Sequence, residues 1–173
     1  SLDYAPQTAL TVTLSNGSTI TFGPDYVVGT TVQSTPFTIQ TDDVYKDGET
    51  YEITVASTTG GNFENLVTTD KATVTVTDTK DTTTLTLNDV ISVNEGTGTA
   101  TVGGSLDYAP QTTLVVTLSN GATITFGPNY VVGTVVQSTP FVIQTDDVYK
   151  DGETYTLTVA STIGGNFENL VTT

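Results

Sequence analysis

Residues 10–22 read LTVTLSNGSTITF, and this stretch decides the fold class. Apolar residues alternate with threonines, which is the period of a strand that buries one face. Asn16-Gly17 interrupts the alternation, and this pair is typical of a type I′ hairpin turn. The pattern then resumes as far as Phe22. The stretch therefore predicts a β-hairpin.

The same alternation continues along the chain in short runs between turn residues. We expect further strands at Phe37–Ile39, 51–55, 72–76 and 85–87, where valine, isoleucine, leucine and threonine dominate. No segment shows the 3.6-residue period of a helix. The pattern predicts an all-β chain of immunoglobulin-like β-sandwiches, and the absence of cysteine means that they carry no disulfide.

The chain contains an internal repeat. Residues 1–69 recur at 105–173 with an offset of 104, and only nine positions differ. A period this long exceeds that of solenoid repeats, so each copy is expected to be a whole domain in a tandem array.

A polar stretch at 78–82, DTKDT, is the expected boundary between the two domains. Residues 1–80 are then the C-terminal part of one immunoglobulin-like repeat of about 104 residues, with its opening strands missing. Residues 81–173 are the following repeat without its last strand. We therefore expect a piece of a longer array; the alternative is a self-sufficient two-domain protein.

The composition excludes several classes of function. The chain has 19 Asp and Glu against 4 Lys, a net charge of −15, and no Arg, His or Cys. Histidine- and cysteine-based catalysis and ordinary zinc sites are thereby excluded, and nucleic acid is an implausible partner. No apolar run approaches the roughly 18 residues of a membrane span, and Ser1 does not open a secretion signal. Oxygen ligands remain, which favours hard cations and calcium above all.

The strongest candidate site is the acidic loop TDDVYKDGE at 41–49, which is repeated at 145–153. Like charges about 4 Å apart repel by roughly 4 kcal/mol in a surface-like dielectric. A divalent cation between them makes the net electrostatic interaction attractive. The loop is not an EF-hand, because Thr54 stands where the closing glutamate is needed. The alternative is a solvated acidic hairpin loop. The candidate metal ligands are Asp42, Asp43, Asp47 and Glu49 in the first copy, and Asp146, Asp147, Asp151 and Glu153 in the second.

Three further acids are weaker candidates on their own. Asp78 and Asp81 lie at the boundary between the copies, where linker polar residues are common. Glu95 stands in a short Asn-Glu-Gly motif, and a lone glutamate there is usually solvated.

Together these motifs resemble the calcium-binding Calx-β sandwich and, more closely, the immunoglobulin-like tandem repeats of giant bacterial RTX adhesins, including biofilm and ice-binding adhesins. The resemblance covers essentially the whole chain and is specific at the acidic loop and the boundary. It rests on NEG at 94–96, IQTDDVYKDGETY at 143–155, VTVTD at 74–78, TDTKDTTTLTLND at 77–89 and GGNFENL at 164–170.

The resemblance implies a non-enzymatic extender, secreted to the bacterial cell surface, that is stiffened by structural calcium. Its partners would be neighbouring repeats of the same chain, without nucleic acid, membrane insertion or a small-molecule substrate. One departure is that Lys46 and Lys150 stand where the Calx-β loop usually carries an acid. The implied ligands at one pole are Glu95, Asp146, Asp147, Glu153 and the Val148 carbonyl, with Asp42, Asp43, Glu49, Asp78 and Asp81 in the first unit.

Two rival functions remain. A carbohydrate- or ice-binding module would use the Thr-x-Thr pattern at 73–77 and 84–86. A twisted sandwich offers no wide flat threonine array, which argues against ice. An enzyme would need paired carboxylates that flank a cleft, whereas these acids cluster on a loop.

Overall fold

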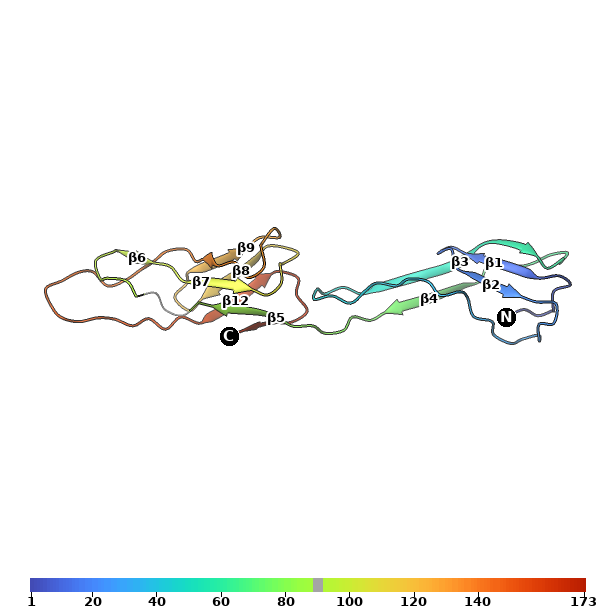
Figure 1. Ribbon diagram of the computed structural model, residues 1–173, viewed down its shortest axis with the longest axis horizontal. Coiled ribbons are helices and arrows are strands. Elements are labelled where there is room, and N and C mark those ends of the chain that lie inside the picture. The colour runs from blue at the N-terminus through green and yellow to red at the C-terminus, as the bar shows by residue number, and fades with distance from the viewer. Residues whose placement is uncertain (89–91) are drawn as a thin grey trace. The chain divides into compact units, whose positions relative to one another are not determined.

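The computed structural model describes residues 1–88 and 92–173; residues 89–91, which include the end of the boundary motif, lie outside the description (Figure 1). All regular structure in the described residues is β-strand, with no helix, so the all-β prediction is confirmed. The chain divides into two compact units. Unit 1 consists of Ser1–Thr41 and Gly48–Asp78, and unit 2 consists of Asp42–Asp47 and Thr79–Thr173.

Unit 1 contains one four-stranded antiparallel sheet with the order β2-β1-β3-β4. Leu10, Val12 and Phe22 form the buried centre of this unit, because the alternation of the hairpin turns them to one face. The strands are β1 (Leu10–Leu14), β2 (Thr19–Phe22), β3 (Glu49–Gly60) and β4 (Lys71–Val76).

The turn of the β1–β2 hairpin differs in type from the prediction. The Gly17 amide donates to the Leu14 carbonyl at 2.9 Å, and the Leu14 amide donates to the Ser18 carbonyl at 2.8 Å. Gly17 has φ 84°, whereas Asn16 is not in the left-handed region that a type I′ turn requires. The predicted hairpin is confirmed, but its loop has three residues and a left-handed glycine at its end.

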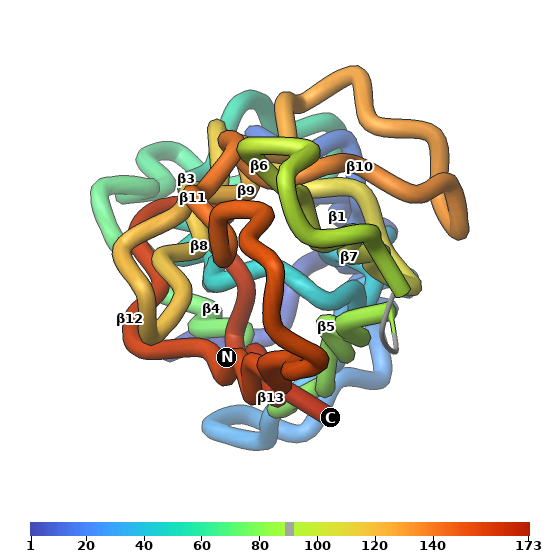
Figure 2. The backbone as a smooth tube through the Cα atoms, turned by 90° about the vertical axis from the view of Figure 1, so that its left-hand side faces the viewer, coloured from blue at the N-terminus to red at the C-terminus, as the bar shows by residue number. Residues whose placement is uncertain are grey.

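Unit 2 contains a sheet with the order β10-β7-β5-β13, a second sheet with the order β12-β8-β9, and the short pair β11-β6. β13 pairs in parallel with β5, and the two lie next to each other in Figure 2. The strands are β5 (Thr83–Leu87), β6 (Thr99–Ala100), β7 (Gly103–Leu106), β8 (Leu114–Leu118), β9 (Thr123–Phe126), β10 (Val136–Gln137), β11 (Phe141–Val142), β12 (Val159–Gly164) and β13 (Leu170–Thr172).

The core of unit 2 joins residues from both larger sheets. Leu85 and Leu106 come from the first sheet, and Leu114, Val116 and Phe126 come from the second; all five are at most 2% exposed. Each such side chain contributes about 1.5–3 kcal/mol of burial free energy. Two sheets that share one core are consistent with the predicted β-sandwich.

The strand predicted at Phe37–Ile39 is wrong for the first copy, where these residues are irregular. Its counterpart in the second copy is β11, which pairs with β6. The residues 104 positions before β6 would precede Ser1, so Phe37 has no such partner in this sequence. A strand of this length needs a ladder partner to form.

Candidate functional site

The segment Asp42–Asp47 belongs to unit 2, although it lies within the first sequence copy. Val44 is 8% exposed and is part of the unit 2 core. The next residue, Tyr45, stacks on Phe167, with ring centroids 5.8 Å apart and an interplanar angle of 23°. Two side chains of the acidic loop are thus anchored in unit 2.

Hydrogen bonds hold the backbone of the same segment. The Lys46 amide donates to the Asn166 carbonyl at 3.1 Å, and the Glu168 amide donates to the Val44 carbonyl at 3.2 Å. These two bonds form an antiparallel bridge that is centred on Tyr45 and Phe167. The Tyr45 hydroxyl donates to the Ala109 carbonyl at 2.6 Å, which satisfies the polar end of the ring.

Acidic residues surround this anchored segment. Asp43 Oδ1 accepts a hydrogen bond from the Tyr45 amide at 2.8 Å, so this carboxylate shapes the loop. Asp81 lies in unit 2 as well, and its amide donates to the Glu168 carboxylate. Of the first-copy candidates, unit 2 therefore contains Asp42, Asp43, Asp47 and Asp81. Glu168 was not among the predicted ligands, because the motif GGNFEN favoured a turn over the alternative of a minor metal site.

The remaining two first-copy candidates, Glu49 and Asp78, belong to unit 1. Glu49 begins β3, opposite Val76. Its carboxylate accepts a hydrogen bond from the Tyr51 hydroxyl, and this bond is the main reason that the pKa of Tyr51 is raised. Asp78 follows β4.

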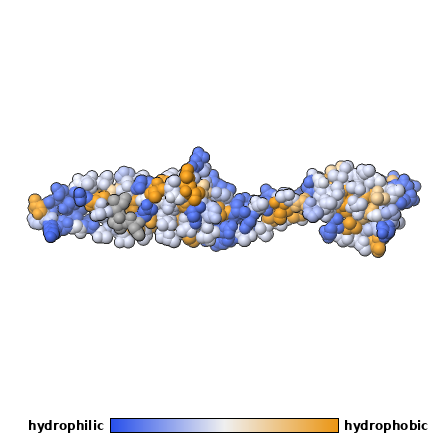
Figure 3. Space-filling model, in the orientation of Figure 1, coloured by the Kyte–Doolittle hydropathy of each residue, from blue (hydrophilic) through white to orange (hydrophobic). Residues whose placement is uncertain are grey.

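The second-copy acids gather at the end of unit 2 that contains the loop after β11. Figure 3 shows this end as strongly hydrophilic, with a small hydrophobic area at its tip. Burial raises the pKa of Glu95, and the negative charges of Asp151, Asp146 and Asp147 raise it further. Glu95 Oε2 is buried and has no hydrogen-bond partner among the residues that the structure describes. Burial and the three neighbouring negative charges therefore both disfavour the charged form of Glu95.

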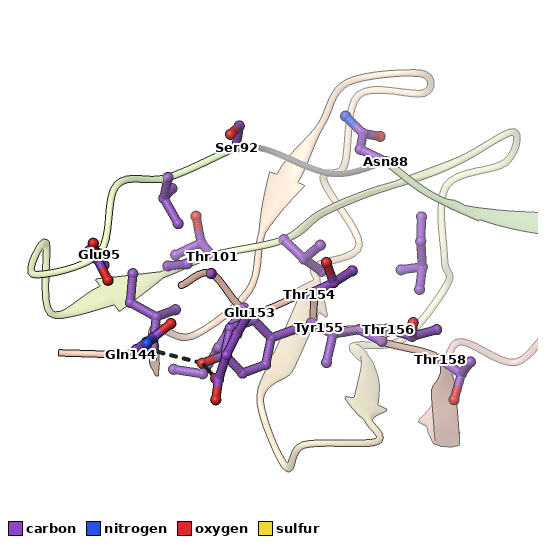
Figure 4. Close-up of a pocket in the computed structure, with 18 of the residues that line it drawn as sticks. Asn88, Ser92, Glu95, Thr101, Gln144, Glu153, Thr154, Tyr155, Thr156 and Thr158 are labelled. Atoms are coloured by element: carbon purple, nitrogen blue, oxygen red, sulfur yellow. Dashed lines mark hydrogen bonds between the residues drawn. The ribbon is translucent and has the colours of Figure 1, made fainter. Parts of the chain in front are cut away.

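Glu153 is held by a neighbouring tyrosine. The Tyr155 hydroxyl accepts a hydrogen bond from the Gln144 amide at 3.1 Å and donates to Glu153 Oε2, so the three residues lie together in Figure 4. The bond to Glu153 is the main reason that the pKa of Tyr155 is raised. Tyr51 makes the same pair of contacts in unit 1, with its hydroxyl 3.1 Å from the Gln40 amide. The sequence analysis did not predict this role of the two tyrosines.

A cavity of about 1090 Å³ opens beside these acids in unit 2. Glu95, Asp151, Glu153 and Tyr155 line it together with apolar Leu87 and other residues. Figure 4 shows Glu95 and Glu153 on separate segments of its wall. The acidic cluster therefore borders an open space instead of a closed core.

The chain matches a known protein family over nearly its whole length. The model of the LapA domain matches residues 1–79 and again residues 81–173. The chain belongs to the LapA domain family. LapA domains are parts of LapA-type large bacterial adhesins, cell-surface proteins involved in biofilm, which suggests a structural role. No curated protein and no solved structure matches the chain. None of the described residues form a helix long and apolar enough to cross a membrane.

The acidic end of this LapA domain has the donor chemistry of a calcium site. Its carboxylates offer oxygen donors, and the buried Glu95 Oε2 accepts no hydrogen bond from any residue that the structure describes. Within residues 1–88 and 92–173, however, no three acidic side chains stand close enough to hold a metal ion. The oxygen donors are of the kind that calcium takes, but the described residues do not form a metal site in this arrangement.

Proposed function

We propose that this chain is an extender repeat of a bacterial surface adhesin. Calcium rigidifies the repeat, which projects adhesive domains away from the cell. The observation that supports it best is the gathering of Glu95 with Asp146, Asp147 and Asp151 at one end of unit 2. Negative charges that lie close together repel one another. A bound divalent cation would neutralise them and so offset this electrostatic repulsion.

Two sets of residues in unit 2 are the proposed ligands. One set is Glu95, Asp146, Asp147 and Asp151, with Glu153 nearby and oriented by Tyr155. The other is Asp42, Asp43 and Asp47 of the anchored segment together with Asp81. Glu49 and Asp78 remain candidates in unit 1. Bound calcium would remove repulsion within each set and hold the loop against its neighbours.

The proposed role is mechanical, and its partners are neighbouring repeats of the same chain. The near-identity of residues 1–69 and 105–173 supports this, because a spacer is lengthened simply by repeating one module. Calcium would be a structural cofactor, bound in the secreted protein.

Calcium is expected to raise the melting temperature and to narrow the distribution of distances between the two units. With affinities of about 0.1–1 mM, typical of extracellular modules, ~1 mM calcium contributes about 0.4–1.4 kcal/mol per site. Magnesium should do so poorly, since it demands a tighter octahedral shell. The chain has no cysteine, so Thr68→Cys and Thr162→Cys introduce two unique labelling sites, one on each unit. Distance measurements between these labels, with calcium and with EDTA, check the result.

If melting and the distance distribution are both indifferent to calcium, the proposal fails. If calcium stabilises the units but leaves the distances broad, the chain binds calcium and is a flexible tether.

Asp146→Asn is expected to weaken calcium binding more than Asp3→Asn does. Both changes remove one charge, but Asp146 lies in the cluster around Glu95, whereas Asp3 is exposed in unit 1. Isothermal titration of the two variants compares a defined site with general attraction to a net charge of −15. Equal losses would show that bulk charge, and no particular site, attracts the ion.

A further inference from the structure

The loop TDDVYKDGE occurs twice, in two different environments. In the first copy Val44 is 8% exposed and Tyr45 stacks on Phe167. In the second copy the same two residues are Val148 and Tyr149, which are 92% and 73% exposed. A valine and a tyrosine that are anchored in one copy therefore stand in solvent in the other.

The exposed loop shares one hydrogen bond with the anchored loop at its tip. The Tyr149 amide donates to Asp147 Oδ1 at 2.7 Å, as the Tyr45 amide donates to Asp43 Oδ1 at 2.8 Å. A loop that is preorganised in this way loses less conformational freedom on binding.

Unit 1 presents the surface that such a loop would need. In unit 2 the anchored segment contacts Asn166, Phe167 and Glu168, whose counterparts in unit 1 are Asn62, Phe63 and Glu64. Phe167 is 7% exposed under Tyr45, whereas Phe63 is only half-buried.

The backbone around Phe63 has the same conformation as that around Phe167. Asn62 and Asn166 both have left-handed φ angles, 57° and 59°. The Gln7 amide donates to the carbonyl of Gly61, and the Gln111 amide donates to the carbonyl of Gly165, both at 3.1 Å. Each glycine directly precedes the asparagine. The asparagine side chain donates back to that glutamine, at 2.5 Å in unit 1 and 2.6 Å in unit 2. The receiving surface is thus built without a bound loop.

We propose that the loop 146–151 docks on the Asn62–Glu64 surface of a second copy of this chain. Val148 and Tyr149 then occupy the places that Val44 and Tyr45 take in unit 2. Three hydrogen bonds form. The Lys150 amide donates to the Asn62 carbonyl, and the Glu64 amide donates to the Val148 carbonyl. The Tyr149 hydroxyl donates to the Ala5 carbonyl. This pattern repeats the hydrogen bonds of the anchored segment.

The association is head-to-tail, because the loop and the receiving surface are different parts of the chain. Such heterologous contacts build open rows of molecules and not closed two-fold dimers. Separate chains bind weakly, since two anchor side chains make a small interface and each chain carries a net charge of −15. Salt strengthens the binding by screening this charge. Covalent linkage in an array would raise the effective concentration of the loop to the millimolar range or higher.

The test is sedimentation and NMR of the full chain in EDTA, which keeps it independent of the calcium proposal. At a high protein concentration, chosen because small interfaces bind weakly, association should increase with salt. Concentration-dependent shifts should appear both at Val148–Tyr149 and at Asn62–Glu64. Tyr149→Ala should weaken association about tenfold or more, as loss of an aromatic anchor does. Ile163→Ala is the matched control, because Ile163 is also 73% exposed on unit 2, and it should change nothing.

A peptide with the sequence TDDVYKDGE should compete with the association, whereas TDDVAKDGE should not. Monomeric chains at all salt concentrations would overturn the proposal. Association that survives Tyr149→Ala, or that stops at symmetric dimers, would overturn it as well.

Discussion

Gly164→Ala is expected to unfold unit 2 or to destabilise it by more than about 3 kcal/mol. Gly164 has φ 87°, and a Cβ at this position would lie 2.0 Å from the Thr113 carbonyl oxygen. Gly164 also pairs with Leu114 at the end of the β12–β8 ladder, and Leu114 is fully buried. The backbone cannot shift away without disturbing that ladder and the core beneath it.

Gly121→Ala is the matched control, because Gly121 has φ 86° but nothing within 4 Å of an added Cβ. This change carries only the backbone strain of a left-handed alanine, about 1 kcal/mol. Urea unfolding followed by circular dichroism gives both free energies. Equal losses in the two variants would show that the close approach to Thr113 is relieved without cost.

Tyr45→Ala is expected to destabilise unit 2 by about 2–4 kcal/mol, whereas Tyr149→Ala should change its stability by less than about 0.5 kcal/mol. The two substitutions are made in identical nine-residue sequences, so only the surroundings differ. Tyr45 loses its stacking on Phe167 and its hydrogen bond to the Ala109 carbonyl. Tyr149 is exposed, and no described residue stacks on its ring or accepts a hydrogen bond from its hydroxyl.

Tyr45→Phe separates the two contributions, since it keeps the ring and removes the hydroxyl. It should cost about 1 kcal/mol, the usual net value of one hydrogen bond. Thermal and urea unfolding of the three variants are the measurements. If Tyr45→Ala were as mild as Tyr149→Ala, the anchored segment would contribute nothing to unit 2.

Local features of this chain could be predicted from its sequence, and long-range ones could not. The β1–β2 hairpin depends on neighbouring residues, so the alternation around Asn16-Gly17 was sufficient to predict it. The strand at Phe37–Ile39 failed because its formation depends on a partner strand, and none of the described residues pairs with it in the first copy. The three-residue turn was missed because the pair Asn-Gly is compatible with more than one hairpin loop.

The candidate site, too, could be predicted only where it depends on residues that are neighbours in the sequence. The acidic loops could be recognised from their carboxylates, and the charges of Asp146, Asp147 and Asp151 act on Glu95 in the structure. No local rule could assign different surroundings to two identical loops. The contact of Tyr45 with Phe167 joins residues far apart in the sequence, and so does the bond from Asp81 to Glu168. Tyr155 and Glu153 are close in sequence, but their hydrogen bond depends on how the chain turns at Gln144.

The parallel pairing of β13 with β5 determines how unit 2 responds to tension. A pull that enters through Thr79 draws β5 toward its own beginning, and a pull on Thr173 draws β13 toward its own end. In a parallel pair these two directions are opposed along the strands, so the ladder is loaded in shear. The bonds from the Thr83 amide to the Asn169 carbonyl and from the Thr173 amide to the Leu85 carbonyl then carry the force together. An antiparallel hairpin pulled from its open end would lose such bonds one at a time, at a lower force.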